Sequence, residues 1–427
     1  MHWPVPAALR LRNSGLAVAL AALGVLLSAP PAAADSAETL PGGVFRLHVR
    51  PMVAAFNERW SSDGEREQLT HDLDDVELDN QVFTDLGQLE RVYGMSDGSL
   101  SVGRSHIRSD AMIQAIVFAA EYGVTDRLTV GLIVPYVRAV NSLGTLSMDP
   151  GDIGRNPGDG KIKEDDAAYL PLDHDKDPST KPLDPLEVKD VKRILEEDYG
   201  YAPLDSFKTH GLGDLELGAK YRVVELGPWH TSLQAGVRAP TGDISDPDNI
   251  LAIGLGAGCW AAGFGWQNDL LPHRDVRLNL TLRYNLQLPD KQVRRVQMAA
   301  DLPITSEDNK EEVWRDLGDS FEVEAAAAWR PLPWLTPYLR YKYFDKQRDE
   351  IRGNRGLGYE SLMDLTDGKN HLLEAGITFS TLSWLQAGKT QVPFEATLAY
   401  EQSIAGRNRA IVTHTVALDM ATYFKAF

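Results

Sequence analysis

The chain has 427 residues, a formal net charge of −18 and a single cysteine, Cys259. One cysteine excludes an intramolecular disulfide and a cysteine-based zinc site, and an acidic chain without a basic patch repels nucleic acid. No nucleotide-binding or zinc motif occurs in the sequence either. We therefore expect no nucleic-acid partner, no cofactor and no resident metal.

Residues 1–34 have the pattern of a cleavable signal peptide. Arg10 and Arg12 precede an apolar run at residues 15–27, and the alanines at 32–34 suit signal peptidase. The run is short for a membrane helix, so an uncleaved anchor is the less favoured alternative. We predict export, with a mature protein that comprises residues 35–427.

The mature chain alternates apolar and polar residues in many segments. In residues 276–288, Leu278, Leu280 and Leu286 belong to an entirely apolar face, whereas Arg277 and Arg283 belong to a polar one. Alternate side chains of a strand point to opposite sides, so this period indicates β-strands. The uncharged residues 250–266 hold five glycines, which disfavour a membrane helix and favour a strand there too.

We predict twelve strands, with ten or fourteen as the neighbouring alternatives. They cover residues 44–56, 104–122, 127–139, 212–224, 229–240, 249–264, 275–288, 319–329, 336–346, 370–381, 391–403 and 410–424. Short connections alternate with long polar ones at 57–103, 140–211, 289–318 and 347–369. Short periplasmic turns and long extracellular loops are typical of outer-membrane barrels. The predicted fold is therefore all-β, a transmembrane antiparallel β-barrel.

The strand ends and the chain end agree with this fold. Aromatic residues occur near strand ends, where interfacial girdles place them: Tyr122, Tyr136, Trp229, Trp260, Trp329, Trp334, Tyr338, Tyr400 and Tyr423. The last strand is followed by Phe427, which resembles the C-terminal signal read by the barrel-assembly machinery. We expect that machinery, outer-membrane lipid and lipopolysaccharide to be partners of the chain in the cell outer membrane.

Two segments resemble a known family. AEYGVTDRLTVGLIVPYV (residues 120–137) and GLGDLELGAKYRV (211–223), followed by GVRAPTGD (236–243), are similar to outer-membrane proteins of the phenol meta-degradation type and to related proteobacterial barrels. These motifs cover about the middle third of the chain. The resemblance implies a barrel that passes small hydrophobic or aromatic compounds. The long acidic loop 140–211 departs from the compact pattern of that family.

The polar faces of the predicted strands carry charges of both signs that would meet in the lumen. The expected lumen residues are Glu121, Glu216, Lys220, Arg222, Arg238, Arg277, Arg283, Glu322, Glu324, Glu374, Glu395 and Glu401, together with Arg340 or Lys342. Opposite charges in a confined lumen pair, since unpaired ones are costly. Two interpretations stay open: a salt-bridge network that holds the barrel, or a polar constriction that selects solutes.

A wall of small residues is expected on predicted strand 249–264, where Ala252, Gly254, Gly256 and Gly258 share the inward face. Such a wall leaves room for loop 140–211 to fold into the lumen. Within that loop, residues 186–199 have helical spacing. The alternatives are a helix exposed at the surface, or glycines that relieve barrel curvature.

No catalytic centre is visible in the sequence. Ser105 and His106 are adjacent, so a strand would point them to opposite faces, and His210 lies outside any nucleophile motif. Residues 173–184 begin like a calcium loop, but Pro178 stands where its sharp turn needs glycine. We expect a passive channel for small solutes. The alternatives are a non-conducting structural barrel and, with less support, a lipid hydrolase.

Overall fold

The computed structural model describes residues 36–155, 169–172, 184–298 and 304–425. The predicted signal peptide, most of the calcium-loop segment and Phe427 lie outside the described residues. Among the residues described, no helix is long and apolar enough to cross a membrane.

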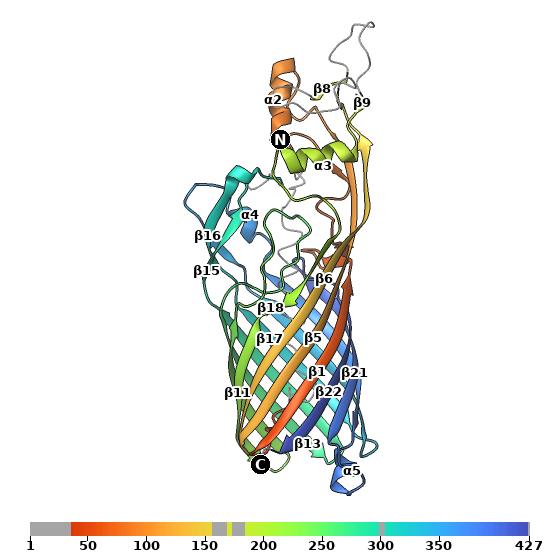
Figure 1. The fold of residues 1–427 in the computed structure, drawn as a ribbon, viewed down its shortest axis with the longest axis vertical. Coiled ribbons are helices and arrows are strands. Elements are labelled where there is room, and N and C mark those ends of the chain that lie inside the picture. The colour runs from red at the N-terminus through yellow and green to blue at the C-terminus, as the bar shows by residue number, and fades with distance from the viewer. Residues whose placement is uncertain (1–35, 156–168, 173–183, 299–303, 426–427) are drawn as a thin grey trace, which may run out of the picture.

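Twelve antiparallel strands pair in chain order around a closed ring, and β1 completes the ring by pairing with both β5 and β22 (Figure 1). The strands are β1 (Val44–Phe56), β5 (Gly103–Thr125), β6 (Leu128–Pro150), β11 (Leu215–Leu226), β12 (Trp229–Ala239), β13 (Ala261–His273), β14 (Val276–Gln287), β17 (Ser320–Trp329), β18 (Leu335–Lys346), β20 (Gly368–Ser380), β21 (Phe394–Arg407) and β22 (His414–Lys425). The predicted fold class and strand number are confirmed.

The predicted sixth strand, 249–264, is wrong in position. Residues 249–260 form no strand, and β13 occupies 261–273, most of which lies between the predicted strands 249–264 and 275–288. Leu251, Ile253 and Leu255 are buried inside the barrel. A segment that places a large apolar residue at every second position in the barrel interior has the same alternating sequence as a strand that faces lipid. The true strand was hidden because Gln267 and Asp269 fill its lumen face and mimic a polar turn.

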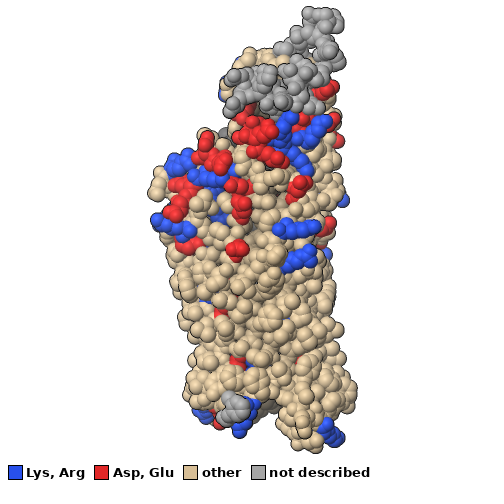
Figure 2. Space-filling view, in the orientation of Figure 1, with Lys and Arg blue, Asp and Glu red and all other residues tan. Residues whose placement is uncertain are grey.

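Charged side chains gather toward the two ends of the barrel and are sparse over its middle, where large apolar side chains are exposed (Figure 2). Leu217 is 58% exposed, and Leu278, Leu280 and Leu286 also project outward, as their alternation predicts. Three tyrosines on this face each pair with a histidine of the next strand: Tyr136 with His210, Tyr341 with His371 and Tyr400 with His414. Amphipathic side chains of this kind suit the boundary between lipid and water.

Two of the residues expected in the aromatic girdles point into the lumen instead. The Tyr338 hydroxyl donates to Glu374 over 2.6 Å, and the Tyr423 hydroxyl donates to Glu395. Leu339 and Leu418 are exposed to lipid, and each lies an odd number of positions from the tyrosine on its strand. Both tyrosines therefore lie on the inward face. Whether a side chain faces lipid or the lumen therefore depends on its place in the alternation of the strand, and less on its distance from the strand end.

One end of the barrel carries the tight turns, the beginning of β1, the end of β22 and the short helix α5 (Leu382–Gln386) (Figure 1). The other end carries the long loops. There β5 and β6 extend beyond the barrel as a ladder from Gly103 paired with Pro150. The outer elements are β2 (Glu58–Trp60), β3 (Arg66–Gln68), β4 (Val76–Glu77), α2 (Thr84–Tyr93), β7 (Ile153–Arg155), β8 (Tyr169–Pro171), β9 (Asp184–Pro185), α3 (Val188–Glu197), β10 (Phe207–Leu212), β15 (Asp290–Arg295), η1 (Glu307–Asn309), β16 (Lys310–Asp316), β19 (Glu350–Arg352) and α4 (Glu360–Met363).

The helix expected within residues 186–199 is α3. Its Ile194 and Leu195 pack with Phe83, the residue before α2, and with Leu86 of α2 in an apolar cluster above the barrel (Figure 1). The described part of loop 140–211 therefore builds a cap beyond the strands. Among the described residues, the loop between β12 and β13 enters the barrel from this end.

Candidate functional site

One side of the lumen holds a continuous network of buried ion pairs. Arg283 of β14 pairs with Glu322 and, over 2.9 Å, with Glu324 on β17. The network continues across β18 and β20 to β21, through Arg340 with Glu324 and Glu374 at 3.5 and 2.6 Å and Lys342 with Glu401 at 3.3 Å. Glu324 is 0% exposed. Because these buried charges have partners of opposite sign, this side of the lumen wall avoids the cost of an unpaired buried charge.

A second charged group lies across β1, β5 and β22. His48 is buried between Glu121 and Asp419, at 3.1 and 3.3 Å from their carboxylate oxygens, and Arg46 also pairs with Glu121. Only Glu121 was named from the sequence. The others follow from the alternation in β1, where Phe45, Leu47 and Val49 are the outward residues and the intervening positions face the lumen.

The remaining predicted lumen residues lie outside these two groups. Arg222 donates to the carbonyl of Asp126 over 3.0 Å, and Arg277 pairs with Glu38. Arg238 donates through Nη2 to Gln287 over 2.8 Å. Glu216 and Lys220 face the lumen on β11, on either side of Gly218.

The other side of the lumen is apolar toward its outer end, and the β12–β13 loop covers it. Ile253 and Leu255 of that loop pack with inward residues of β1, β5, β6 and β22. Those residues are Met52, Ala54, Phe56, Ala111, Ile113, Ala115, Val137, Ala139 and Ala417. We call residues 249–257 the outer plug.

The small residues expected to line the barrel wall are not on a strand: Ala252, Gly254 and Gly256 belong to the outer plug, and Gly258 follows it directly. Two of these glycines are required by the backbone, because a Cβ on Gly256 would lie 2.3 Å from the Asp214 carboxylate and Gly258 has a φ of +75°. The Asp214 carboxylate also accepts from the Ala257 amide over 2.8 Å. These contacts tie the plug to the start of β11.

The lumen is also occupied from the end with the tight turns, by residues 36–42. We call this segment the inner plug. Ser36 Oγ and the Ala37 amide donate to the Asp269 carboxylate over 2.9 and 3.0 Å, and Lys220 Nζ donates to the Ser36 carbonyl over 3.1 Å. Ser232 donates to the Ala37 carbonyl. Ala37 is 0% exposed, so the start of the described chain is enclosed by the barrel.

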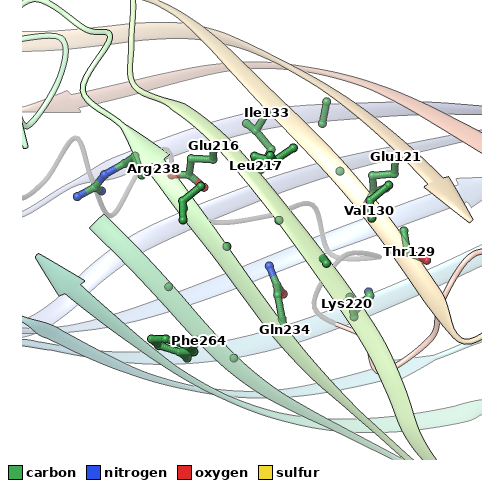
Figure 3. Close-up of a pocket in the computed structure, with 18 of the residues that line it drawn as sticks. Glu121, Thr129, Val130, Ile133, Glu216, Leu217, Lys220, Gln234, Arg238 and Phe264 are labelled. Atoms are coloured by element: carbon green, nitrogen blue, oxygen red, sulfur yellow. The ribbon is translucent and has the colours of Figure 1, made fainter. Parts of the chain in front are cut away.

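A chamber with a cavity of about 150 Å³ lies in the lumen against β6, β11, β12 and β13 (Figure 3). Its polar lining includes Glu216, Gln234 and Arg238. One row of paired positions supplies a glycine from each of the four strands: Gly131, Gly218, Gly236 and Gly263. Lipid-facing Leu217 and Phe264 also border the cavity, because glycines leave the wall only one backbone thick.

The residues considered for catalysis do not assemble into a site. Ser105 donates its hydroxyl to the Leu73 carbonyl, whereas exposed His106 pairs with Asp149, so the two adjacent side chains point apart. His210 bonds to Tyr136 on the outer surface. Within the described ranges, no three acidic, histidine or cysteine side chains are placed to hold a metal ion.

Solved structures share the architecture at low sequence identity. The COG4313 outer membrane channel from Pseudomonas putida F1 matches with a TM-score of 0.52 and 10% identity, over 93% of this chain and 99% of that one. The transport unit of the autotransporter AIDA-I from Escherichia coli has a TM-score of 0.40 at 8% identity, over 97% and 99%. The toluene transporter TbuX from Ralstonia pickettii has 0.35 at 10%, over 91% and 90%. The first likeness establishes the barrel fold, and the other two are too distant to add to it.

No curated protein sequence matches the chain significantly. A family model does match, over residues 95–411, from the loop before β5 to the loop after β21. The match extends well beyond the middle third in which the hairpin motifs were found. With its closed barrel and apolar outer band, the chain is an outer-membrane protein, and the family match shows that it belongs to the family described as "Putative MetA-pathway of phenol degradation".

Proposed function

We propose that this protein is a passive outer-membrane channel for small hydrophobic or aromatic solutes. The observation that carries the proposal is the lumen itself, which holds a chamber of about 150 Å³ and is not packed solid with side chains. A purely structural barrel of twelve strands has no need of such a space, because inward side chains can fill it.

The plugs determine how such a channel would work. The outer plug contacts the wall largely through Ile253 and Leu255, and the inner plug contacts it through hydrogen bonds at Asp269 and Lys220. Neither segment is a strand of the barrel, so either can move without opening the strand ring. A solute would therefore pass by displacing the outer plug, entering the chamber and leaving past residues 36–42.

The alternative is a non-conducting barrel with a role in maintaining the envelope. The buried ion pairs of Arg283, Arg340 and Lys342 and the two plugs favour this reading, because together they close the lumen. The two functions differ in whether removal of the plugs exposes a pathway.

The proposal includes the route to the membrane and the partners there. Cleavage after Ala34 would leave the new N-terminus one residue before Ser36, which is already inside the lumen. The final strand β22, followed by Phe427, would be read by the barrel-assembly machinery. Charged side chains at the end with the long loops would contact lipopolysaccharide (Figure 2).

The test is solute uptake into proteoliposomes that contain the refolded protein. We expect swelling with small aromatic acids, less swelling with sugars and amino acids, and faster swelling for a variant that lacks residues 36–42. A heat-modifiable gel shift confirms that each protein is folded. If neither the full protein nor the shortened variant admits any solute, the barrel is non-conducting and the channel proposal is wrong.

A further inference from the structure

We propose that the chamber binds planar, one-ring solutes that carry both a hydrogen-bond donor and an anionic or accepting group. This inference rests on the proposed channel function and narrows its substrate class. It separates such solutes from plain hydrocarbons, which offer neither group.

The size and floor of the chamber suit a flat ring. A cavity of about 150 Å³ is large enough for one benzene-sized molecule. Gly218 points inward, because its neighbour Leu217 faces the lipid, and it pairs directly with Gly236, which in turn pairs with Gly263. Without side chains, these positions offer bare peptide planes that a planar molecule can approach closely.

The rim of the chamber supplies one acceptor, Glu216, and one donor, Arg238, that each have unused hydrogen-bonding capacity. Among the described residues, the Glu216 carboxylate forms no hydrogen bond or ion pair. Arg238 stands opposite Glu216 in the strand register, yet its guanidinium points away from Glu216 (Figure 3) and donates to Gln287. Its buried Nε has no hydrogen-bond partner and lies 3.9 Å from Asp214.

The chemistry of the ligand follows from these two groups. A lumen carboxylate and a buried N–H without hydrogen-bond partners each cost free energy once an apolar ring in the chamber excludes the water that solvates them. A ring with a hydroxyl at one edge and a carboxylate at the other can donate to Glu216 and accept from Arg238. Selectivity then arises mainly from rejection of solutes that leave the pair unsatisfied.

The experiment is calorimetric titration of the full protein with four probes that vary the two groups separately. These are 4-hydroxybenzoate, 4-methylbenzoate without the donor, 4-methylphenol without the acid, and toluene with neither. We expect 4-hydroxybenzoate to bind most tightly and toluene most weakly. Because a hydrogen bond to a charged group is lost, Glu216→Gln should weaken 4-hydroxybenzoate about tenfold to a hundredfold and leave 4-methylbenzoate unchanged.

Two further variants test the rest of the site. Arg238→Gln should weaken both acids and spare 4-methylphenol. Gly218→Ala, whose Cβ would lie 3.3 Å from the Ala235 carbonyl, should weaken every probe by a similar factor, because it raises the floor. Thr397→Val is the control, since this lumen hydroxyl bonds to Thr378 on β20 and not to the chamber.

Equal affinity for toluene and 4-hydroxybenzoate, or an equal effect of Glu216→Gln on both acids, would overturn the inference. Absence of binding for all four probes would overturn it as well. Uptake of solutes into liposomes is measured separately, so a channel without this selectivity still conducts, whereas a barrel that admits nothing fails the proposed function first.

Discussion

Replacement of Asp269 should release the inner plug. The Asp269 carboxylate accepts from Ser36 Oγ and from the Ala37 amide, and both bonds are buried. A hydrogen bond to a charged group contributes about 1.5–3 kcal/mol, so Asp269→Ala should remove about 3 kcal/mol of binding free energy between plug and wall. At 1.4 kcal/mol for each factor of ten, the equilibrium should shift toward the released plug on the order of a hundredfold.

Thiol labelling measures this release directly. Ala37→Cys in a Cys259→Ala background places one thiol at a fully buried position of the plug while keeping the amide that donates to Asp269. A membrane-impermeant maleimide should label this thiol slowly in the parent and on the order of a hundredfold faster after Asp269→Ala, if labelling requires release. Asp269→Asn, which retains one acceptor oxygen, should fall between them.

The control is Thr397→Val, which changes the lumen without touching residues 36–42 and should leave the labelling rate unaltered. Equal labelling rates with and without Asp269, in proteins that are equally folded by gel shift, would refute the reasoning. The plug would then be held by contacts other than this carboxylate.

Three other perturbations have defined outcomes. Glu324→Gln should lower stability by about 3 kcal/mol or more, because Arg283 and Arg340 lose a buried partner, and an unchanged temperature of the heat-modifiable gel shift would contradict this. Although burial alone would raise it, hydrogen bonds from Lys310 and Arg295 hold the pKa of Asp248 below its usual value. A depressed carboxylate pKa stabilises the folded state above the ordinary value near 4 and ceases to do so as pH falls through the folded value. The protection factors of the outer loops against hydrogen exchange, which are corrected for the intrinsic pH dependence of exchange, should therefore be constant from pH 7 to about 5 and fall below about 4. A fall near pH 6 would exclude Asp248 as the cause. Burial raises the pKa of the Cys259 thiol, so the native protein should react slowly with maleimide at neutral pH. Leu255→Asn, which loosens the outer plug, should speed that reaction, and an unchanged rate would show that the plug does not protect the thiol.

The alternation of side chains was enough to predict most of the barrel. Leu278 and Arg283 point to opposite faces because successive residues of a strand must do so, and the twelve strands and their alternating loops follow from repeating that rule. The same rule placed Glu324, Glu374 and Glu401 in the lumen, where the structure pairs them.

Alternation also misled where two environments share a period. Ile253 and Leu255 are apolar at every second position, as a lipid-facing strand would be, but they cover an apolar patch inside the barrel. Gln267 and Asp269 made the real strand look like a turn. A two-residue period indicates that one face of a segment is apolar, but it does not indicate whether lipid or protein covers that face.

The sequence by itself determined the class of fold, the number of strands, the apolar outer band and the charged character of the lumen, because these depend on the local pattern of each strand. Only the tertiary structure decided which charges pair, that the β12–β13 loop is the outer plug, and that residues 36–42 close the other end. Ser36 and Asp269 are 233 positions apart. Contacts of that range depend on the closed barrel bringing distant segments together, and no local pattern encodes them.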